Sequence, residues 1–508
     1  MPLVPPCRLL TAVLTALAIA SALPAQSSEY SPDWKSLNRH LVGRWFQEAR
    51  LGIIVQWGVA SVPGQSRDYA RLMYLPAEPT SPNPVWVYHQ KHYGHPSEFG
   101  YKDLLPYWEG QRWDPKALAS LFKKTQAGYV VVLATDRDNI DLFDSAHHGW
   151  NAKRFGPRRN VAVEWAEALR AEGLKVGLAL NNGRAWDYLR PAQGAEWEGP
   201  FADKPFDGNE TAREGETHWW RGLDPRDLYG KPRPGNAFVA LPIRPVPGPS
   251  GPDARFQETW FKRAEDAIAQ VKPNVLIVEG GLPHGPWGMK LAASYFGLSN
   301  RGRPDPVNGH ALVLPTVAEA RAESYVKLAG SGQTVTGRGQ KWLVELDLAK
   351  DGIRTDVPPV LSASDILVRL AETVSKGGNL LLRVALRSDG SLPEEQASVL
   401  EQLGGWLTRN KRAILGATAG PAITVQGGTK LFATRTDSAI YVIFSKWPGR
   451  AVLRVEGLGN VSRGRWNNGE EAQIGSEEGK TVIETPAKAP DDLLPVLEIP
   501  MATTDFDA

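Results

Sequence analysis

The sequence predicts an α/β domain built on parallel strands, followed by a smaller β-sandwich. Up to about residue 411, short apolar runs rich in β-branched residues alternate with amphipathic stretches of helical length. Beyond that point the pattern changes to short alternating runs separated by glycine and asparagine turns. A chain of 508 residues also exceeds what a single core supports, so two domains are expected.

The first domain, which we place at residues 30–411, shows strands and helices in alternating order. The predicted strands are 51–55, 129–133, 175–180, 275–278 and 379–384, and the predicted helices are 113–124, 161–172, 256–270, 363–375 and 394–410. Strands that alternate with helices pair in parallel, which fits an α/β barrel or a doubly wound sheet, and sequence period alone does not separate the two. The segment 192–253 is rich in Pro, Gly and charge, so we expect a long excursion on the loop face, with a flexible segment as the alternative.

The second domain, placed at residues 412–508, shows the period of two that is typical of half-buried strands. The predicted strands are 431–435, 440–445, 451–455 and 481–485. Because turn residues separate these runs at short intervals, the pattern favours a β-sandwich.

The N-terminus has the pattern of a secretory signal peptide. Arg8 precedes an apolar run from Leu9 to Leu23, and small residues then lead to a polar segment. We therefore expect residues 1–25 to be removed and the protein to be secreted or periplasmic. The run is shorter than the roughly 20 residues that span a membrane, and a retained anchor is the alternative. The only cysteine, Cys7, would leave with the signal, so no disulfide is expected.

The charge balance and the histidine pattern exclude several classes of function. Lys and Arg total 58 against 56 Asp and Glu, and no long basic run is present, so a nucleic-acid partner is not expected. His89, His92 and His95 recur every three residues, but the glycine and proline around His95 break any helix that could present them together to a metal. We predict no metal site and no cofactor.

Several motifs in the first domain occur in the order found in a known family of enzymes. An apolar strand ends in Gln56-Trp57-Gly58 and is followed by a Ser-Val-Pro turn. Further along are His92-Tyr93-Gly94, Trp113-Asp114-Pro115, Leu142-Phe143-Asp144-Ser145, Gly156-Pro157-Arg158-Arg159, Lys272-Pro273-Asn274 and Ser375-Lys376-Gly377-Gly378-Asn379. From about residue 45 to 415 the chain resembles the retaining α-L-fucosidase family of glycoside hydrolases. The resemblance implies a (β/α) TIM-like barrel, a glycan substrate and exo-glycosidase activity.

The positions with which that family holds its sugar carry different residues here. The family's His-Trp-Gly histidine is replaced by Gln56, and its Glu-Trp pair by Arg67-Asp68. Its His-His pair is replaced by Asp136-Arg137, and Asp138 matches the aspartate that follows. The substrate-binding residues implied by the resemblance are Gln56, Trp57, Asp68, Asp136, Arg137 and Asp138. The nearby pair His147-His148 comes too late in the chain to replace the family's histidines, and we expect a loop there.

The resemblance places the nucleophile at Glu279, where the family has aspartate. Glu279 ends the apolar run 275–278 and precedes two glycines, so its carboxylate should emerge at the mouth of the barrel, where such enzymes act. A structural ion pair is the alternative reading. Retaining hydrolysis also needs a second carboxyl group as acid/base. The family's acid lies on a variable downstream loop, which points to Glu319 first, then Glu323 or Glu345, although solvated surface charges explain the first two equally well.

The charged cluster that follows strand 129–133 leaves the activity open. Arg137 could pair with a carboxylate or sulfate on a sugar, or with a neighbouring aspartate. The leading interpretation is a retaining exo-glycosidase that acts on terminal fucosyl or a related sugar. One alternative is a catalytically inactive, glycan-binding descendant. The other is a hydrolase of sulfated or charged glycans, with Arg67 and Arg137 as anion partners.

Overall fold

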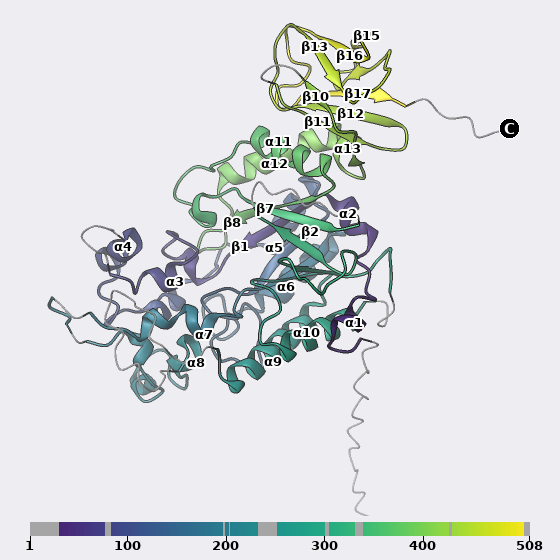
Figure 1. Ribbon diagram of the computed structural model, residues 1–508. Coiled ribbons are helices and arrows are strands. Elements are labelled where there is room, and N and C mark those ends of the chain that lie inside the picture. Colours follow the sequence, from purple (N-terminus) through teal and green to yellow (C-terminus); the bar gives the residue numbers. More distant parts are fainter. Residues whose placement is uncertain are drawn as a thin grey trace, which may run out of the picture.

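The protein, seen here as a computed structural model, consists of a barrel with a β-sandwich at one end (Figure 1). The structure describes residues 30–76, 83–196, 199–202, 204–231, 251–299, 304–330, 339–425 and 429–501. The expected signal peptide, residues 1–25, lies outside these ranges. In the described part of the chain, no helix is both long and apolar enough to cross a membrane.

Eight parallel strands form a closed barrel in sequence order. They are β1 (Leu51–Gln56), β2 (Tyr129–Thr135), β3 (Lys175–Leu180), β4 (Val275–Val278), β5 (Ala311–Leu314), β6 (Val326–Ala329), β7 (Lys341–Asp347) and β8 (Asn379–Ala385). The first strand pairs with both neighbours, since Val55 lies opposite Val132 on β2 and Val384 on β8. This closure confirms the barrel and excludes the doubly wound sheet.

The crossover helices surround the barrel, and those predicted from the sequence are present: α5 (Pro115–Lys124), α6 (Val161–Ala171), α9 (Ala254–Val271), α11 (Ala363–Ser375) and α12 (Glu394–Arg409). Helix α10 (Pro286–Gly297) was not predicted. Local chemistry sets several of their starts: Asp114, Asp253 and Ser362 each accept a hydrogen bond from a backbone N–H of the first turn. Each helix buries one apolar stripe against the strands.

Strands β5, β6 and β7 were not predicted. The first two are only four residues long, and two of the four residues of β6 are half-buried. β7 contains Glu345 and ends at Asp347. The hydrophobic periodicity of a short strand with charged residues does not distinguish it from a loop. Pairing with the neighbouring strands is what holds these segments in extended conformation.

Smaller elements cover the two ends of the barrel. The short helices are α1 (Trp34–Leu37), α2 (Arg44–Ala49), α3 (Tyr69–Leu72), α4 (Pro84–His92), α7 (Ala185–Tyr188), α8 (Pro225–Tyr229) and α13 (Lys411–Ile414). The 3-10 turns are Val59–Ser61, Tyr101–Tyr107, Arg190–Gln193, Asp207–Asn209, Glu214–Thr217 and Lys350–Gly352. The described part of the predicted excursion, 192–253, contributes several of these to the loop face.

The C-terminal domain consists of two antiparallel sheets. The four-stranded sheet has the order β10-β13-β16-β15 and the five-stranded sheet the order β14-β17-β12-β11-β9. The strands are β9 (Thr418–Ala419), β10 (Thr424–Val425), β11 (Leu431–Arg435), β12 (Ala439–Phe444), β13 (Ala451–Glu456), β14 (Arg465–Trp466), β15 (Gln473–Glu477), β16 (Lys480–Thr485) and β17 (Val496–Pro500). The predicted sandwich is confirmed, and its five-stranded sheet faces α11.

Candidate active site

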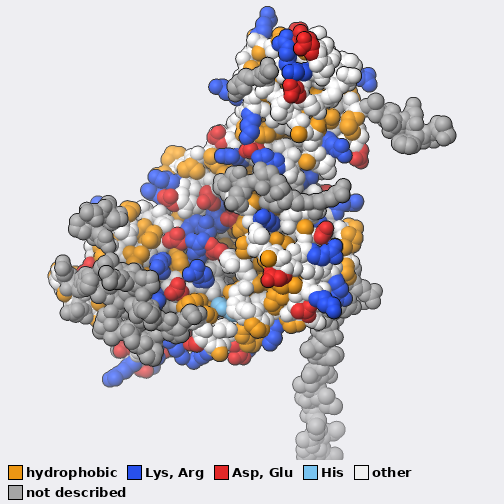
Figure 2. All heavy atoms as spheres, viewed as in Figure 1, with side chains coloured by type: hydrophobic (Ala, Val, Ile, Leu, Met, Phe, Trp, Pro, Cys, Tyr) orange, Lys and Arg blue, Asp and Glu red, His pale blue; other side chains and the backbone are white. Residues whose placement is uncertain are grey.

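The carboxyl ends of the barrel strands bring together polar side chains that are far apart in sequence. Gln56 ends β1, Asp136 and Arg137 follow β2, Asn181 follows β3, and Glu279 follows β4. Figure 2 shows basic and acidic side chains side by side around a hollow in the visible face of the barrel. We call this group of strand ends the mouth. It is the face on which barrel enzymes carry their active sites.

Arg137 is the centre of the network at the mouth. Its Nε donates to both carboxylate oxygens of Glu279, at 3.1 and 3.0 Å, and one terminal nitrogen also bonds Glu279. The other terminal nitrogen donates to Asp68 at 2.6 Å, and the hydroxyl of Tyr188 donates to the same Asp68 oxygen at 2.7 Å. The Glu279 hydrogen bonds are the main reason that the pKa of Arg137 is raised. The guanidinium therefore fixes two partly exposed carboxylates, Glu279 (33%) and Asp68 (42%), in one arrangement.

A second layer of hydrogen bonds lies beneath Arg137. Gln56 donates to Asp136 at 2.6 Å, Asn181 donates to its other oxygen at 3.1 Å, and the backbone N–H of Arg137 adds a bond of 2.9 Å. Burial alone would raise the pKa of Asp136, but the charge of Arg67 and these hydrogen bonds outweigh it and lower the pKa. Asp136 is thus an ionised support for the loop that carries Arg137.

Arg383 connects this layer to the opposite side of the barrel. It lies buried on β8 and donates to Glu345 at 2.6 Å, to Asp347 at 3.0 Å and to the side-chain amide oxygen of Gln56 at 3.2 Å. One guanidinium therefore ties β7, β8 and β1 together below the mouth. Glu345, one of the candidates for the acid, is held in this ion pair.

Two predicted sugar contacts prove to be supports beneath the surface. Gln56 is only 1% exposed and bonds Asp136 and Arg383. Asp138 is also buried, and it accepts hydrogen bonds from the Tyr101 hydroxyl at 2.7 Å and the Ile140 N–H at 3.2 Å. Burial, together with the charge of Asp136, raises the pKa of Asp138 to about 7. Both side chains shape the mouth from below and do not line it.

Trp57, another residue that the resemblance implies as a sugar contact, is also buried. Its side chain is 1% exposed and packs against Trp108 and Trp113, with ring centroids 5.0 and 5.1 Å away. Its indole N–H donates to the carbonyl of Arg387 at 2.9 Å. Because three indoles fill the space under the mouth, Trp57 is part of the core.

Glu319, the first choice for the acid, lies toward the other end of the barrel. It is in an exposed turn, and its backbone carbonyl accepts a hydrogen bond from Asn38 at 2.9 Å. Asn38 also bonds Ser324, which stands just before the start of β6. Residues at strand starts are at the opposite end of the barrel from Glu279, so this position does not suit a proton donor for it. Glu323 is similarly exposed and pairs with Arg321.

The three evenly spaced histidines have separate partners. His89 is buried between the Tyr69 hydroxyl and the Phe99 carbonyl, His92 bonds a backbone carbonyl, and His95 pairs with Glu196 at 3.1 Å. Within the described ranges, no group of three or more His, Cys, Asp or Glu side chains is arranged to hold a metal ion.

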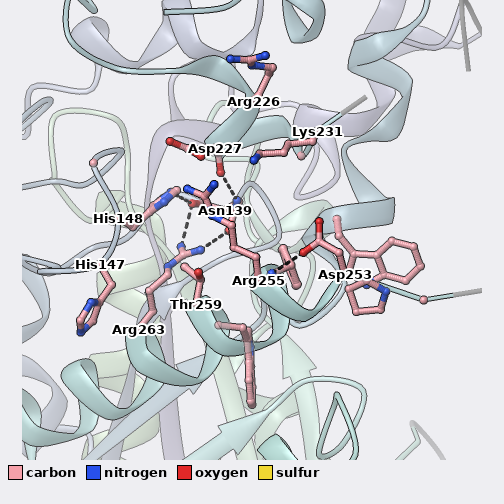
Figure 3. A pocket seen from close by; sticks show the side chains of 17 residues that line it. Asn139, His147, His148, Arg226, Asp227, Lys231, Asp253, Arg255, Thr259 and Arg263 are labelled. Carbon is pink, nitrogen blue, oxygen red and sulfur yellow. Dashed lines mark hydrogen bonds between the residues drawn. The ribbon is translucent and has the colours of Figure 1, made fainter. Parts of the chain in front are cut away.

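A cavity of about 540 Å³ lies beside the mouth (Figure 3). It is lined by Asn139 and His148 from the β2 loop, Trp186 from α7, and basic and aromatic side chains from α8, α9 and their flanks: Arg226, Lys231, Arg255, Phe256, Trp260 and Arg263. Arg263 is buried at its floor, bonded to Asp141 and to Asn139. His148 lies in a loop, as expected, and its Nε2–H donates to the backbone carbonyl of Asn139 at 2.9 Å.

Sequence reasoning missed three residues that build the mouth. Asn181 directly follows β3, Tyr188 ends α7, and Arg383 interrupts the apolar strand β8. A charged residue inside a buried strand was a readable signal for Arg383, because such a group requires a partner. Tyr188 gave no such signal, since it reaches Asp68 only through the fold of the loop after β3.

The same fold and sequence pattern occur in known proteins. The sequence profile of the family described as alpha-L-fucosidase matches residues 17–412. The tissue alpha-L-fucosidase of Rattus norvegicus is 24% identical over 452 residues, which cover 87% of this chain and 85% of the relative. The tissue alpha-L-fucosidase of Homo sapiens is also 24% identical, over 84% of this chain and 80% of the relative.

Among solved structures, the alpha-fucosidase of Thermotoga maritima has a TM-score of 0.68 at 24% identity and covers 92% of this chain and 100% of its own. A Thermotoga maritima alpha-L-fucosynthase, solved with alpha-L-Fuc-(1-2)-beta-L-Fuc-N3, has a TM-score of 0.69 at 25% identity, with 93% and 100% covered. The closed barrel, the sandwich and the profile match agree. The chain belongs to the α-L-fucosidase family of glycoside hydrolases and is a divergent member of it.

Proposed function

We propose that this protein is a retaining exo-glycosidase in which Glu279 is the nucleophile, acting on a terminal fucosyl or related sugar. The observation that carries the proposal is the position of the Glu279 carboxylate. It leaves the end of β4, is partly exposed in the mouth, and is held side-on by Arg137. A nucleophilic carboxylate must be fixed in direction, and a bidentate guanidinium provides this. The fucosyl ligand of the related fucosynthase supports the class of sugar.

We assign the acid/base role to Asp68. Within the described chain it is the carboxylate that shares the Arg137 guanidinium with Glu279, and it is the more exposed of the two. A sugar that draws Asp68 away from Arg137 would leave this carboxyl group facing the leaving oxygen, where it can donate the proton that departure requires. The covalent intermediate then releases its sugar to a water that Asp68 deprotonates.

A second candidate function rests on the same ion pair. Both oxygens of Glu279 already accept hydrogen bonds from Arg137, which lowers the nucleophilicity of the carboxylate. If substrate does not release it, the protein is a glycan-binding descendant without turnover.

The decisive experiment is turnover of an aryl α-L-fucoside by wild type, Glu279→Gln and Asp68→Ala. We expect the Glu279 variant to lose at least about 10³-fold in kcat. Azide should restore the activity of Asp68→Ala. The product is then a glycosyl azide that retains the anomeric configuration, and NMR of this first product shows its configuration directly. Glu401→Gln, an exposed change on α12, is the matched control. Glycan binding without turnover in wild type would establish the second function, and an inverted first product would refute the retaining mechanism.

We also propose that the protein is exported by its N-terminal segment, Arg8 with the apolar run from Leu9 to Leu23. Expression with the full N-terminus in a bacterial host, followed by N-terminal sequencing, should find a mature chain that begins near residue 26. A cytoplasmic product that still carries Met1 would contradict this.

A further inference from the structure

The three arginines at the mouth differ in their partners. Arg137 and Arg383 each donate to two carboxylates. Arg67 makes no hydrogen bond or ion pair with any residue that the structure describes, and its Nε is buried without an acceptor. A buried donor that lacks an acceptor is costly, so such a group in a native site calls for an explanation.

The backbone around Arg67 is shaped to hold its side chain. A Cβ added at Gly352 would lie 2.6 Å from the Arg67 Cδ and 3.2 Å from an oxygen of Asp347. Gly352 has a φ of +68°, in the region that favours glycine. The turn that follows β7 therefore leaves room for the Arg67 stem, and the charge of Arg67 acts on Asp136 beneath the mouth.

The carboxylates around Arg67 have other partners. Asp136, whose pKa the Arg67 charge lowers, already accepts hydrogen bonds from Gln56, Asn181 and a backbone N–H. Asp347 is bonded to Arg383. The donors of Arg67 are thus left for a group from outside the chain, and the fork of a guanidinium suits an acceptor with two oxygens.

We propose that Arg67 binds an anionic substituent of the sugar in the mouth, a carboxylate or a sulfate ester, and that the substrate of this enzyme is an acidic glycan. This inference about Arg67 rests on the proposed function in one respect, because the role of Glu279 as nucleophile determines where the sugar lies.

The cavity beside the mouth offers the same chemistry independently. Lys231 and Arg255 form no ion pair with a described residue, and both line the cavity together with Asp227, on which their charges act (Figure 3). Helix α7 contributes Trp186 to this cavity and Tyr188 to the mouth. A glycan that extends from the mouth along α7 therefore meets a second pair of cations, placed for the charge of the next sugar unit.

Direct binding tests the role of Arg67 without relying on turnover. Calorimetric titration of wild type with L-fucose, a sulfated fucose and a hexuronic acid should show at least tenfold tighter binding of one charged sugar, and which one it is identifies the anion. Arg67→Gln should remove the advantage of the charged sugar over L-fucose, and Arg67→Lys should restore part of it. Arg44→Gln, an exposed change on α2, should behave as wild type.

Equal affinity of wild type for neutral and charged sugars would overturn the inference, as would a preference that survives in Arg67→Gln. Thermal melts of each variant show whether the chain has folded. Because titration is independent of hydrolysis, a protein that binds charged sugar through Arg67 but fails the fucoside assay would refute the proposed function alone. Turnover of the neutral fucoside with no preference for charge would refute only this inference.

The cavity is tested with the double variant Lys231→Gln/Arg255→Gln. It should weaken binding of a charged tetrasaccharide about tenfold and leave the charged monosaccharide unaffected. Unchanged tetrasaccharide affinity would remove the cavity from the binding site.

Discussion

At the scale of single residues, arginines fix the carboxylates at and below the mouth. Guanidinium groups stay charged near neutral pH and bind carboxylates in pairs. Arg137 aligns Glu279 and Asp68, and Arg383 aligns Glu345 and Asp347. The carboxylate of Glu279 therefore has a fixed position although its side chain is partly exposed.

Asp138 makes stability depend on pH in a direction that can be worked out. The unfolded chain releases this proton near the ordinary value of 3.8, whereas the folded chain keeps it until about pH 7. Between these values the folded state binds more protons, so stability falls as pH rises from about 4 to 7 and levels off above. In Asp138→Asn the side chain still accepts the hydrogen bond from Tyr101 but does not titrate. The variant should therefore lose this pH dependence of the free energy of unfolding, which amounts to as much as about 4 kcal/mol at pH 8. Urea unfolding at pH 4.5 to 8 measures it.

The exposed change Asp437→Asn is the control and should leave the slope as in wild type. Asp207, whose burial raises its pKa to about 6, contributes a fall of the same sign in both proteins. A slope that Asp138→Asn leaves untouched would contradict the assignment.

At the scale of elements, close packing between two helices requires a residue without a side chain at the point of contact. Helices α12 and α5 approach at Gly404, where an added Cβ would meet the Lys124 carbonyl oxygen at 2.4 Å and the Thr125 Cα at 2.9 Å. The next residue, Gly405, has only the end of Arg409 nearby, at 3.7 Å. Two adjacent glycines in one helix therefore have different reasons to be there.

Alanine at each position separates these reasons. Gly404→Ala should destabilise the protein by about 1 to 3 kcal/mol, because backbone atoms must move apart. Gly405→Ala should be neutral or stabilise it by up to about 1 kcal/mol, because alanine favours the helix and meets no obstacle. Equilibrium urea unfolding compares the two, and similar effects at both sites would show that helix propensity, not packing, decides.

At the scale of the whole molecule, the barrel and the sandwich share a core. The main hydrophobic cluster runs from the barrel strands through α11 and α12 to one face of the five-stranded sheet, including Ile443 and Val496. The opposite face of the same sheet, with Val442, belongs to a separate cluster inside the sandwich. Trp406 adds a hydrogen bond to the Leu494 carbonyl at 3.0 Å. The two domains are thus joined by apolar packing as well as by the chain.

Neighbouring residues on β12 test this coupling. Wild type should unfold in one calorimetric transition, and Ile443→Ala should destabilise it by about 2 to 5 kcal/mol and split the transition, because the cavity lies between the domains. Val442→Ala, whose cavity faces the sandwich alone, should lower the transition without splitting it. Two transitions in wild type would show that the shared core does not couple the domains.

The sequence by itself determined the alternation of strands and helices, the change to a sandwich and the family. It did so because local hydrophobic patterns predict strands β1 to β4 and β8 and the amphipathic helices. It also placed Glu279 at the end of a strand. It did not determine what that carboxylate touches. Arg137 bonds Glu279 from a segment 142 residues away in the chain, and Asp68, 211 residues before Glu279, bonds the same guanidinium. Trp57 is buried against Trp108 and Trp113. The hydrophobic periodicity of a segment shows which of its faces is apolar. The partners of a charged side chain depend instead on closure of the barrel, because closure brings strand ends together whatever their separation in the sequence.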